Sequence, residues 1–312
     1  NYGSTVKDVY IDSGSLSTED CGANSIGATG TLSTSSGTYY NYFCLISNFS
    51  SYFSPPPSSS PTMVYAYDEA DVASNLNSDT TIELQTNITL SAGGGTSSAF
   101  TISGAVNLVI NGNGHSIRFD SSSTSNGRFF YIEAFSDVEI NDLTLENGYV
   151  YGASDDDGGG ALYSSMSYLA MNGCELSSNK VSHFSGDLNG AMGGAVHVIA
   201  SEAPFYAAFT STVFSRNTVT HGNSHDGASG GAAYISSSNV TLSSCLFYRS
   251  LATVTSYGSS YGGAIYMTGE STVVSSFGSY FTANFAGKVA NAVYNYGSTV
   301  KDVYIDSGSL ST

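Results

Sequence analysis

Hydrophobic and polar residues alternate in short runs along most of the chain. Two such runs, 108–111 (LVIN) and 138–145 (VEINDLTL), place Val, Ile or Leu at nearly every second position. A period of two is typical of strands with one buried face. Gly and Asn separate many of the runs, and both residues accept the left-handed backbone of tight corners. Only residues 67–76 (YDEADVASNL) favour a helix, so we predict an all-β fold with one short helix that caps it.

One motif recurs in the second half of the chain. It reads Gly-Gly-Ala, then an apolar residue, then Tyr or His. Gly-Gly lets a chain turn sharply without a Cβ clash, and the strands between such turns would bury their apolar residues. We therefore predict a solenoid with one motif in each coil. The copies are 159–163, 193–197, 230–234 and 262–266, with a weaker one at 290–294, and the steps between them run from 28 to 37 residues.

A second element follows each of the first four motifs and ends in a corner residue. The elements read LSSN, FSRN, FYRS and FTAN. Because each keeps its place relative to its motif, the corner residues should stack along one edge, ~4.8 Å apart, with each amide donating to its neighbour. The predicted ladder contains Asn179, Asn217 and Asn284, with Ser250 as an interruption. The alternatives to a solenoid are a Gly/Ser-rich β-sandwich and a disordered chain.

These motifs resemble known families. The paired Gly-Gly-Ala and Phe-x-x-Asn elements resemble the repeats of polymorphic outer-membrane proteins, although Phe is kept only at 214, 247 and 281. Residues 79–115, from DTTIEL to INGNGH, are similar to the opening coils of pectate-lyase-like β-helices. Both resemblances, which span about residues 65–312, imply a right-handed parallel β-helix used for polysaccharide cleavage or for surface adhesion.

The two ends of the chain are identical in sequence. Residues 1–18 recur unchanged at 295–312, which implies a repeat of 294 residues cut from a longer tandem array. We therefore divide the chain into a final coil of a preceding repeat (1–18), a Cys-bracketed loop with a Ser/Pro-rich spacer (19–64), and a parallel β-helix (65–312). In a continuous array, the two ends of the chain should lie in register at opposite ends of the solenoid.

The charge of the chain excludes some partners. The net charge is −17, with eight Lys and Arg residues that form no basic patch, so nucleic acid is not an expected partner. The longest apolar runs are far too short to span a bilayer, so we expect no membrane insertion in this segment.

The four cysteines predict one disulfide and two free thiols. Cys21 and Cys44 enclose 22 residues of an otherwise flexible segment, where a disulfide would be most useful, and it would imply an oxidising compartment. Cys174 and Cys245 fall two coils apart, beyond the ~7 Å Cα limit for a bridge, so we expect them to be buried and unpaired. The pairing Cys21–Cys174 remains open.

Several polar sites favour an extracellular location. Asn48, Asn87 and Asn239 each begin an Asn-x-Ser/Thr sequon, and the Ser/Pro tract at 54–61 could carry further glycans. We therefore expect glycans as partners of a secreted or cell-surface protein.

An acidic run is the candidate metal site. Asp155, Asp156 and Asp157 offer hard oxygen ligands for calcium, but a solvated acidic loop is the interpretation that we favour. No basic residue accompanies them, and no acid neighbours Arg216 or Arg249, which fall at matching positions of adjacent coils. We therefore predict no catalytic residues and no cofactor, with calcium at this run as the alternative.

Tandem identity without catalytic residues predicts a structural polymer. A solenoid is stiff because each coil bonds to the next. We predict a module of a secreted extracellular filament, such as a flagellar hair (mastigoneme) or a surface fibre, with identical repeats end to end. The alternatives are the stalk of a cell-surface adhesin and, third, a polysaccharide lyase or hydrolase.

Overall fold

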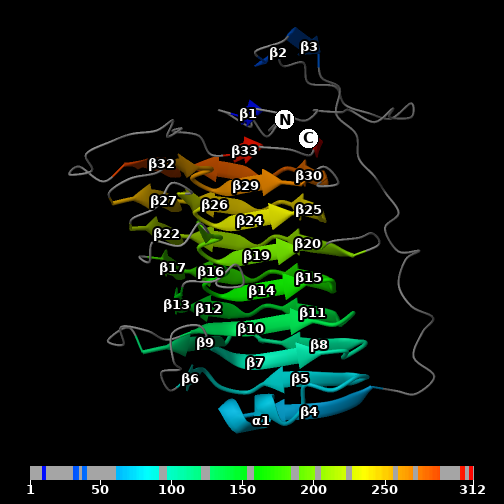
Figure 1. The fold of residues 1–312 in the computed structure, drawn as a ribbon. Coiled ribbons are helices and arrows are strands. Elements are labelled where there is room, and N and C mark those ends of the chain that lie inside the picture. Colours follow the sequence, from blue (N-terminus) through cyan, green and yellow to red (C-terminus); the bar gives the residue numbers. More distant parts are fainter. Residues whose placement is uncertain are drawn as a thin grey trace, which may run out of the picture.

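The chain winds into a right-handed parallel β-solenoid, with α1 at one end and β33 near the other (Figure 1). This confirms the predicted pectate-lyase-like β-helix architecture. The computed structural model describes residues 9–11, 31–34, 37–40, 61–90, 97–120, 127–152, 158–183, 190–200, 205–222, 227–255, 259–269, 273–288, 303–305 and 309–311.

Three long sheets run along the solenoid axis, and every neighbouring pair of strands in them is parallel. The first sheet contains β7 (Ser98–Ser103), β10 (Arg128–Glu133), β14 (Leu162–Ser165), β19 (Val196–Ile199), β24 (Ala233–Ser236), β29 (Ile265–Thr268), β33 (Val303–Ile305) and β1 (Val9–Ile11). The second contains β4 (Thr62–Ala66), β5 (Thr80–Leu84), β8 (Leu108–Asn111), β11 (Asp137–Asn141), β15 (Tyr168–Asn172), β20 (Tyr206–Thr210), β25 (Asn239–Ser243), β30 (Val273–Phe277) and β34 (Ser309–Ser311). The third contains β6 (Ile88–Leu90), β9 (Ser116–Phe119), β12 (Thr144–Glu146), β16 (Glu175–Ser177), β21 (Val213–Ser215), β26 (Leu246–Tyr248) and β31 (Tyr280–Thr282).

The later coils carry two further short sheets. The fourth sheet contains β13 (Tyr149–Tyr151), β17 (Lys180–His183), β22 (Thr218–His221), β27 (Leu251–Val254) and β32 (Phe285–Lys288). The fifth contains β18 (Ala191–Met192), β23 (Ala228–Ser229) and β28 (Ser260–Tyr261). The predicted spacer holds a β-hairpin, in which β2 (Thr31–Thr34) pairs antiparallel with β3 (Gly37–Tyr40).

The two glycines of each Gly-Gly pair have different structural roles. Gly193, the first of its pair, has a φ of +59°, a backbone conformation that favours glycine. Gly194, the second, packs so closely on the next coil that an added Cβ would clash with the carbonyl oxygen of Gly231. The motif therefore fixes both the turn and the distance between coils.

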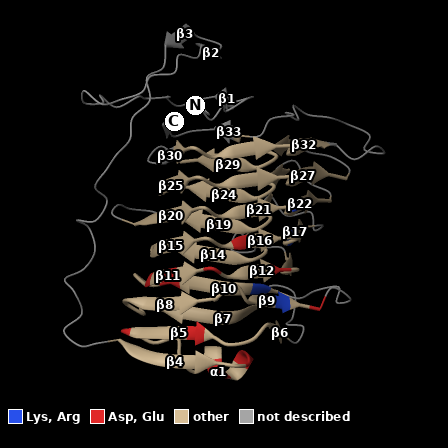
Figure 2. Cartoon of the chain, turned by 180° about the vertical axis from the view of Figure 1, so that it is seen from behind, with Lys and Arg blue, Asp and Glu red and all other residues tan. Residues whose placement is uncertain are grey.

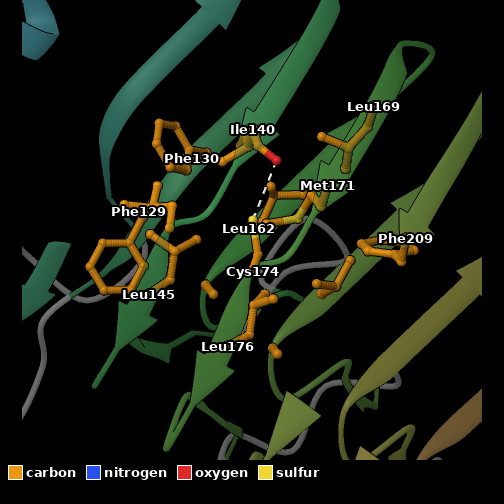
Figure 3. Packing of buried hydrophobic residues seen from close by; sticks show 14 of the residues in the cluster. Phe129, Phe130, Ile140, Leu145, Leu162, Leu169, Met171, Cys174, Leu176 and Phe209 are labelled. Atoms are coloured by element: carbon orange, nitrogen blue, oxygen red, sulfur yellow. Dashed lines mark hydrogen bonds between the residues drawn. The ribbon is translucent and has the colours of Figure 1, made fainter. Parts of the chain in front are cut away.

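The core is a column of apolar side chains inside the coils (Figure 3). On the third sheet the ring centroids of Phe214 and Phe247 lie 4.5 Å apart, and those of Phe247 and Phe281 lie 4.7 Å apart, with the ring planes of each pair stacked nearly parallel. Stacking of identical residues in successive coils is what the in-register sequence motifs predict, because equivalent positions are one strand spacing apart. These columns hold neighbouring coils together by apolar burial.

A short helix covers the start of the core. Helix α1 (Glu69–Ala73) begins after Asp68, whose carboxylate accepts a hydrogen bond from the backbone N–H of Asp71 at 2.9 Å. Val72 is its fully buried residue, and the helix contacts β4 and β6. The helix lies within the predicted range 67–76 and closes the solenoid at the β4 end (Figure 1).

The strand pairing at the other end of the solenoid contradicts the prediction that the two ends of the chain lie at opposite ends of the solenoid. The strand β1, from the first copy of the duplicated segment, pairs parallel with β33, from the second copy, so that Val9 lies opposite Val303 and Ile11 opposite Ile305. Strands β1 and β33 therefore lie at the same end of the solenoid, and the expectation of opposite ends is wrong (Figure 1). The physical reason is that an open strand edge at the end of a solenoid is costly, and β1 supplies backbone pairing for β33.

Candidate functional site

The corner between the third and fourth sheets carries the amide ladder. The Nδ2 group of Asn179 donates to Oδ1 of Asn217 at 3.2 Å, and the backbone N–H of Asn179 donates to the same oxygen at 3.1 Å. Nδ2 of Asn217 donates to the carbonyl oxygen of Leu176 at 2.9 Å. Asn179 and Asn217 are both fully buried, so each amide holds the backbone of the preceding coil where water cannot.

Ser250 breaks this ladder. Asn284 still accepts a hydrogen bond from the backbone N–H of Ser250 at 2.9 Å and donates to the carbonyl oxygen of Phe247 at 3.0 Å. The shorter Ser250 side chain is buried, and within the described residues its hydroxyl has no hydrogen-bond partner. The corner is therefore weaker at this coil.

The two described cysteines are buried free thiols, as expected. Cys174 donates to the carbonyl oxygen of Ile140 at 3.3 Å (Figure 3), and Cys245 donates to that of Phe209 at 3.2 Å. Burial raises the pKa of each thiol to about 11, so both stay protonated and inert at neutral pH.

Several predicted sites lie outside the described residues. These are the Cys21–Cys44 pair, the sequon at Asn48 and the acidic run Asp155–Asp157. Within the residues that the structure describes, no group of three His, Cys, Asp or Glu side chains could hold a metal ion. The other two sequon residues, Asn87 and Asn239, are exposed on the solenoid surface, where a glycan can be attached.

The outer face of the second sheet carries a hollow of about 110 Å³. Asp137 and Glu139 line it from β11, while Tyr168 and Tyr206 line it from β15 and β20. Ala170 pairs with Glu139 in the sheet register, and its small side chain leaves the floor of the hollow low. Figure 2 shows the acidic residues of β11 on this side of the solenoid. Sequence reasoning missed this site.

The charges in the hollow are unbalanced. Neither Lys nor Arg lines it. Burial raises the pKa of the Asp137 carboxyl, and the neighbouring Glu139 raises it further. Burial also raises the pKa of the Tyr206 hydroxyl, and Asp137 and Tyr168 add to the shift. Among the described residues, no side chain donates a hydrogen bond to the Asp137 carboxylate. The site therefore holds negative charge at some energetic cost.

Aromatic side chains extend the hollow towards the corner between the first and second sheets. The rings of Tyr168 and Tyr206 meet edge to face, with centroids 5.2 Å apart. Phe205 contacts Tyr168 at 5.4 Å and Phe135 at 5.3 Å between centroids. Phe135 is 63% exposed and has a φ of +64°, which is unusual for a bulky residue. An exposed ring held in this conformation favours a recognition role over packing.

A second amide ladder borders this face. Nδ2 of Asn141 donates to Oδ1 of Asn111 at 3.0 Å, and Nδ2 of Asn172 donates to Oδ1 of Asn141 at 2.9 Å. Glu83 ends the row by accepting from Nδ2 of Asn111 at 2.7 Å. The signal was present in the sequence, because each of these Asn residues ends a strand one coil after the last.

The first sheet has an aromatic column on its outer face. Tyr131, Tyr163, His197, Tyr234 and Tyr266 follow one another in register, with neighbouring centroids 4.8 to 5.2 Å apart. His197 is buried, and neither of its ring nitrogens has a hydrogen-bond partner among the described residues. Burial, with a contribution from Arg128, lowers the pKa of His197 to about 3, so the imidazole is neutral at physiological pH.

Comparison with known proteins places this geometry in context. Residues 62–183 match a family described as a putative pectate lyase-like adhesive domain. The solenoid is a pectate-lyase-like β-helix. The matched segment contains β11 and β15, and so three of the four side chains that define the hollow, while Tyr206 lies beyond it. No curated protein and no solved structure matches the chain. In the described part of the chain, no helix is long and apolar enough to cross a membrane.

Proposed function

We propose that this β-helix is a non-catalytic adhesive module of an extracellular or cell-surface protein. The observation that carries the proposal is the hollow on the second sheet, which combines aromatic rings with carboxylates on a regular, hydrogen-bonded surface. Such a surface is pre-organised, so little conformational entropy is lost when a partner binds. The adhesive description of the matched family and the exposed sequons at Asn87 and Asn239 support the same role.

The geometry favours binding over cleavage. Glycosidases place two carboxyl groups on opposite sides of the bond that they cleave. Asp137 and Glu139 instead stand side by side on one strand. A base with a lowered pKa, such as Lys or Arg, is also missing from the residues that line the hollow. Arg249 lies at a different corner, with its guanidinium 4.8 Å from the ring of Tyr248.

An attachment assay run beside a cleavage assay tests the proposal. Beads coated with the chain should attach to surfaces that carry extracellular matrix, whereas beads coated with an unrelated protein of equal charge should not. The same preparation, incubated with polygalacturonate and with neutral galactan, should release no unsaturated products and no new reducing ends. Cleavage of either polymer, or attachment equal to that of the control beads, would contradict the proposal.

A filament is the second candidate, and one observation favours it: the unchanged recurrence of residues 1–18 at 295–312. The pairing of β1 with β33 counts against a continuous fibre, because a continuous fibre requires the two copies of the segment to lie at opposite ends of the solenoid. Negative-stain microscopy of native material would distinguish the two. Regular fibres with an axial repeat would support the filament, and isolated rods would support the adhesive module.

A further inference from the structure

The hollow on the second sheet is lined by two carboxylates that have no positively charged neighbour in the lining. Asp137 and Glu139 are two residues apart on the same face of β11, and the Glu139 carboxylate adds to the effect of burial in raising the pKa of Asp137. No cationic side chain lines the hollow. A cation bound in the hollow would relieve this repulsion.

The tyrosines of the hollow are suited to the same ligand. Tyr168 and Tyr206 line the same hollow as the two carboxylates, and aromatic faces attract ammonium and guanidinium groups. The chain already uses this contact elsewhere. The guanidinium of Arg128 lies 5.6 Å from the ring centroid of Tyr131 and 5.3 Å from that of Tyr163.

We propose that the hollow receives lysine or arginine side chains of a basic partner polypeptide, an inference that rests on the proposed adhesive function. The cationic head lies between the Asp137 and Glu139 carboxylates, against the rings of Tyr168 and Tyr206. Ala170 leaves room for it, and a volume of about 110 Å³ accommodates one such head group. The net charge of −17 speeds the encounter with a basic partner.

A saccharide fits these observations less well. A neutral sugar could stack on the tyrosines, but its hydroxyl groups would leave both carboxylate charges without a counter-ion. An anionic polysaccharide would be repelled by the same two groups. A cation is therefore the ligand that uses both features of the hollow.

Fluorescence anisotropy with a capped peptide of alternating Arg and Gly tests this directly. The control peptide carries citrulline, which keeps the shape of Arg and loses its charge. We expect the Arg peptide to bind at least about tenfold more tightly than the citrulline peptide, because citrulline makes neither the ion pairs nor the cation–π contacts of Arg. Equal binding of the two peptides would overturn the proposal.

Two double variants separate the hollow from the general negative charge. Asp137→Asn with Glu139→Gln should weaken binding of the Arg peptide about tenfold. The matched pair Glu69→Gln with Glu175→Gln removes the same charge elsewhere and should weaken it less than about twofold. Equal losses in the two double variants would mean that diffuse charge alone attracts the peptide, and the inference would fail.

A third variant keeps every charge and closes the hollow. Ala170→Leu should lower the affinity for the Arg peptide without changing the net charge, and thermal unfolding checks that each variant folds. Unchanged affinity in Ala170→Leu, or binding of neutral galactan that Asp137→Asn with Glu139→Gln abolishes, would overturn the inference. The proposed adhesive function would survive either result, because attachment and cleavage are measured in the separate bead assay.

Discussion

The buried corner and the exposed face of the second sheet use similar polar residues for opposite purposes. At the corner, Asn179 and Asn217 are fully buried, and their amides are bonded to each other and to the backbone. On the second sheet, Asp137 and Glu139 are half-buried, and Asp137 is costly to ionise. Satisfied polar groups stabilise a fold, whereas unsatisfied ones cost stability and mark places where a ligand can supply what is missing. The difference places stability in the corner and the binding function that we propose on the face.

The largest effect should come from His197, and it should depend on pH. The imidazole of His197 is buried and, among the described residues, makes none of the hydrogen bonds that satisfy the corner asparagines. The folded pKa of His197 is about 3, below the unfolded value of about 6.5, so the unfolded state takes up a proton first as the pH falls. Stability that is present above pH 6.5 is therefore lost progressively towards pH 3. Through this histidine, the wild-type chain should lose about 3 kcal/mol in the free energy of unfolding between pH 7 and pH 4, and His197→Phe should abolish that loss.

Urea unfolding at the two pH values measures this effect. His115→Gln is the control, because His115 is half-buried and lies on another part of the surface. An acid-induced loss of stability that is the same in wild type and His197→Phe would contradict the burial of a neutral imidazole.

Removing a member of the buried ladder should cost a comparable amount of stability. Asn217→Ala removes the acceptor of the buried Asn179 backbone N–H and the side-chain donor to the Leu176 carbonyl oxygen. We expect a loss of about 2–4 kcal/mol in the free energy of unfolding. The matched variant on the exposed face is Asn141→Ala, which should cost at most about 1 kcal/mol because water can replace its bonds. Equal losses would remove the distinction between the two regions.

Repairing the interrupted ladder should raise stability. Ser250→Asn places an amide opposite Asn217, where the serine hydroxyl is buried without a partner among the described residues. We expect a gain of about 1 kcal/mol in the free energy of unfolding, because new hydrogen bonds form at a site already shaped for Asn. The control is Ser250→Ala, and a gain in the Ala variant as large as that in the Asn variant would show that the ladder contributes nothing.

The smallest effect should come from the exposed face, where a substitution should raise stability slightly. The pKa of Asp137 is raised in the folded state, so ionising it disfavours folding at neutral pH. Asp137→Asn should therefore stabilise the chain slightly at pH 7. The gain should disappear as the pH falls through the folded pKa, because the native carboxyl is then protonated as well. Destabilisation at pH 7 would mean that the carboxylate makes a structural contact.

The sequence predicts the fold well because a solenoid repeats one local rule. The interval from Gly-Gly-Ala to the corner residue stays in register, so the strands and the column at Phe214, Phe247 and Phe281 follow from counting. The hollow could not be found this way. Asp137, Tyr168 and Tyr206 are 31 and 38 residues apart, and unequal loops separate them, so only the strand pairing shows that they are neighbours.

The ends illustrate a second limit. An identical segment at 1–18 and 295–312 predicts a continuation, but sequence alone does not say which strand edge the first copy covers. The structure places β1 on β33, because an unpaired edge is costly and a matching strand is present in the same chain.

The division between a stabilising corner and a binding face can be tested most directly by measuring two properties of two variants. Stability and attachment are followed for Asn217→Ala and for Asp137→Asn with Glu139→Gln, with attachment expressed per folded molecule. We predict that the corner variant loses about 2–4 kcal/mol of stability and keeps full attachment, while the face variant keeps its stability and loses attachment. Loss of both properties in both variants, or attachment that survives in the face variant, would contradict this account.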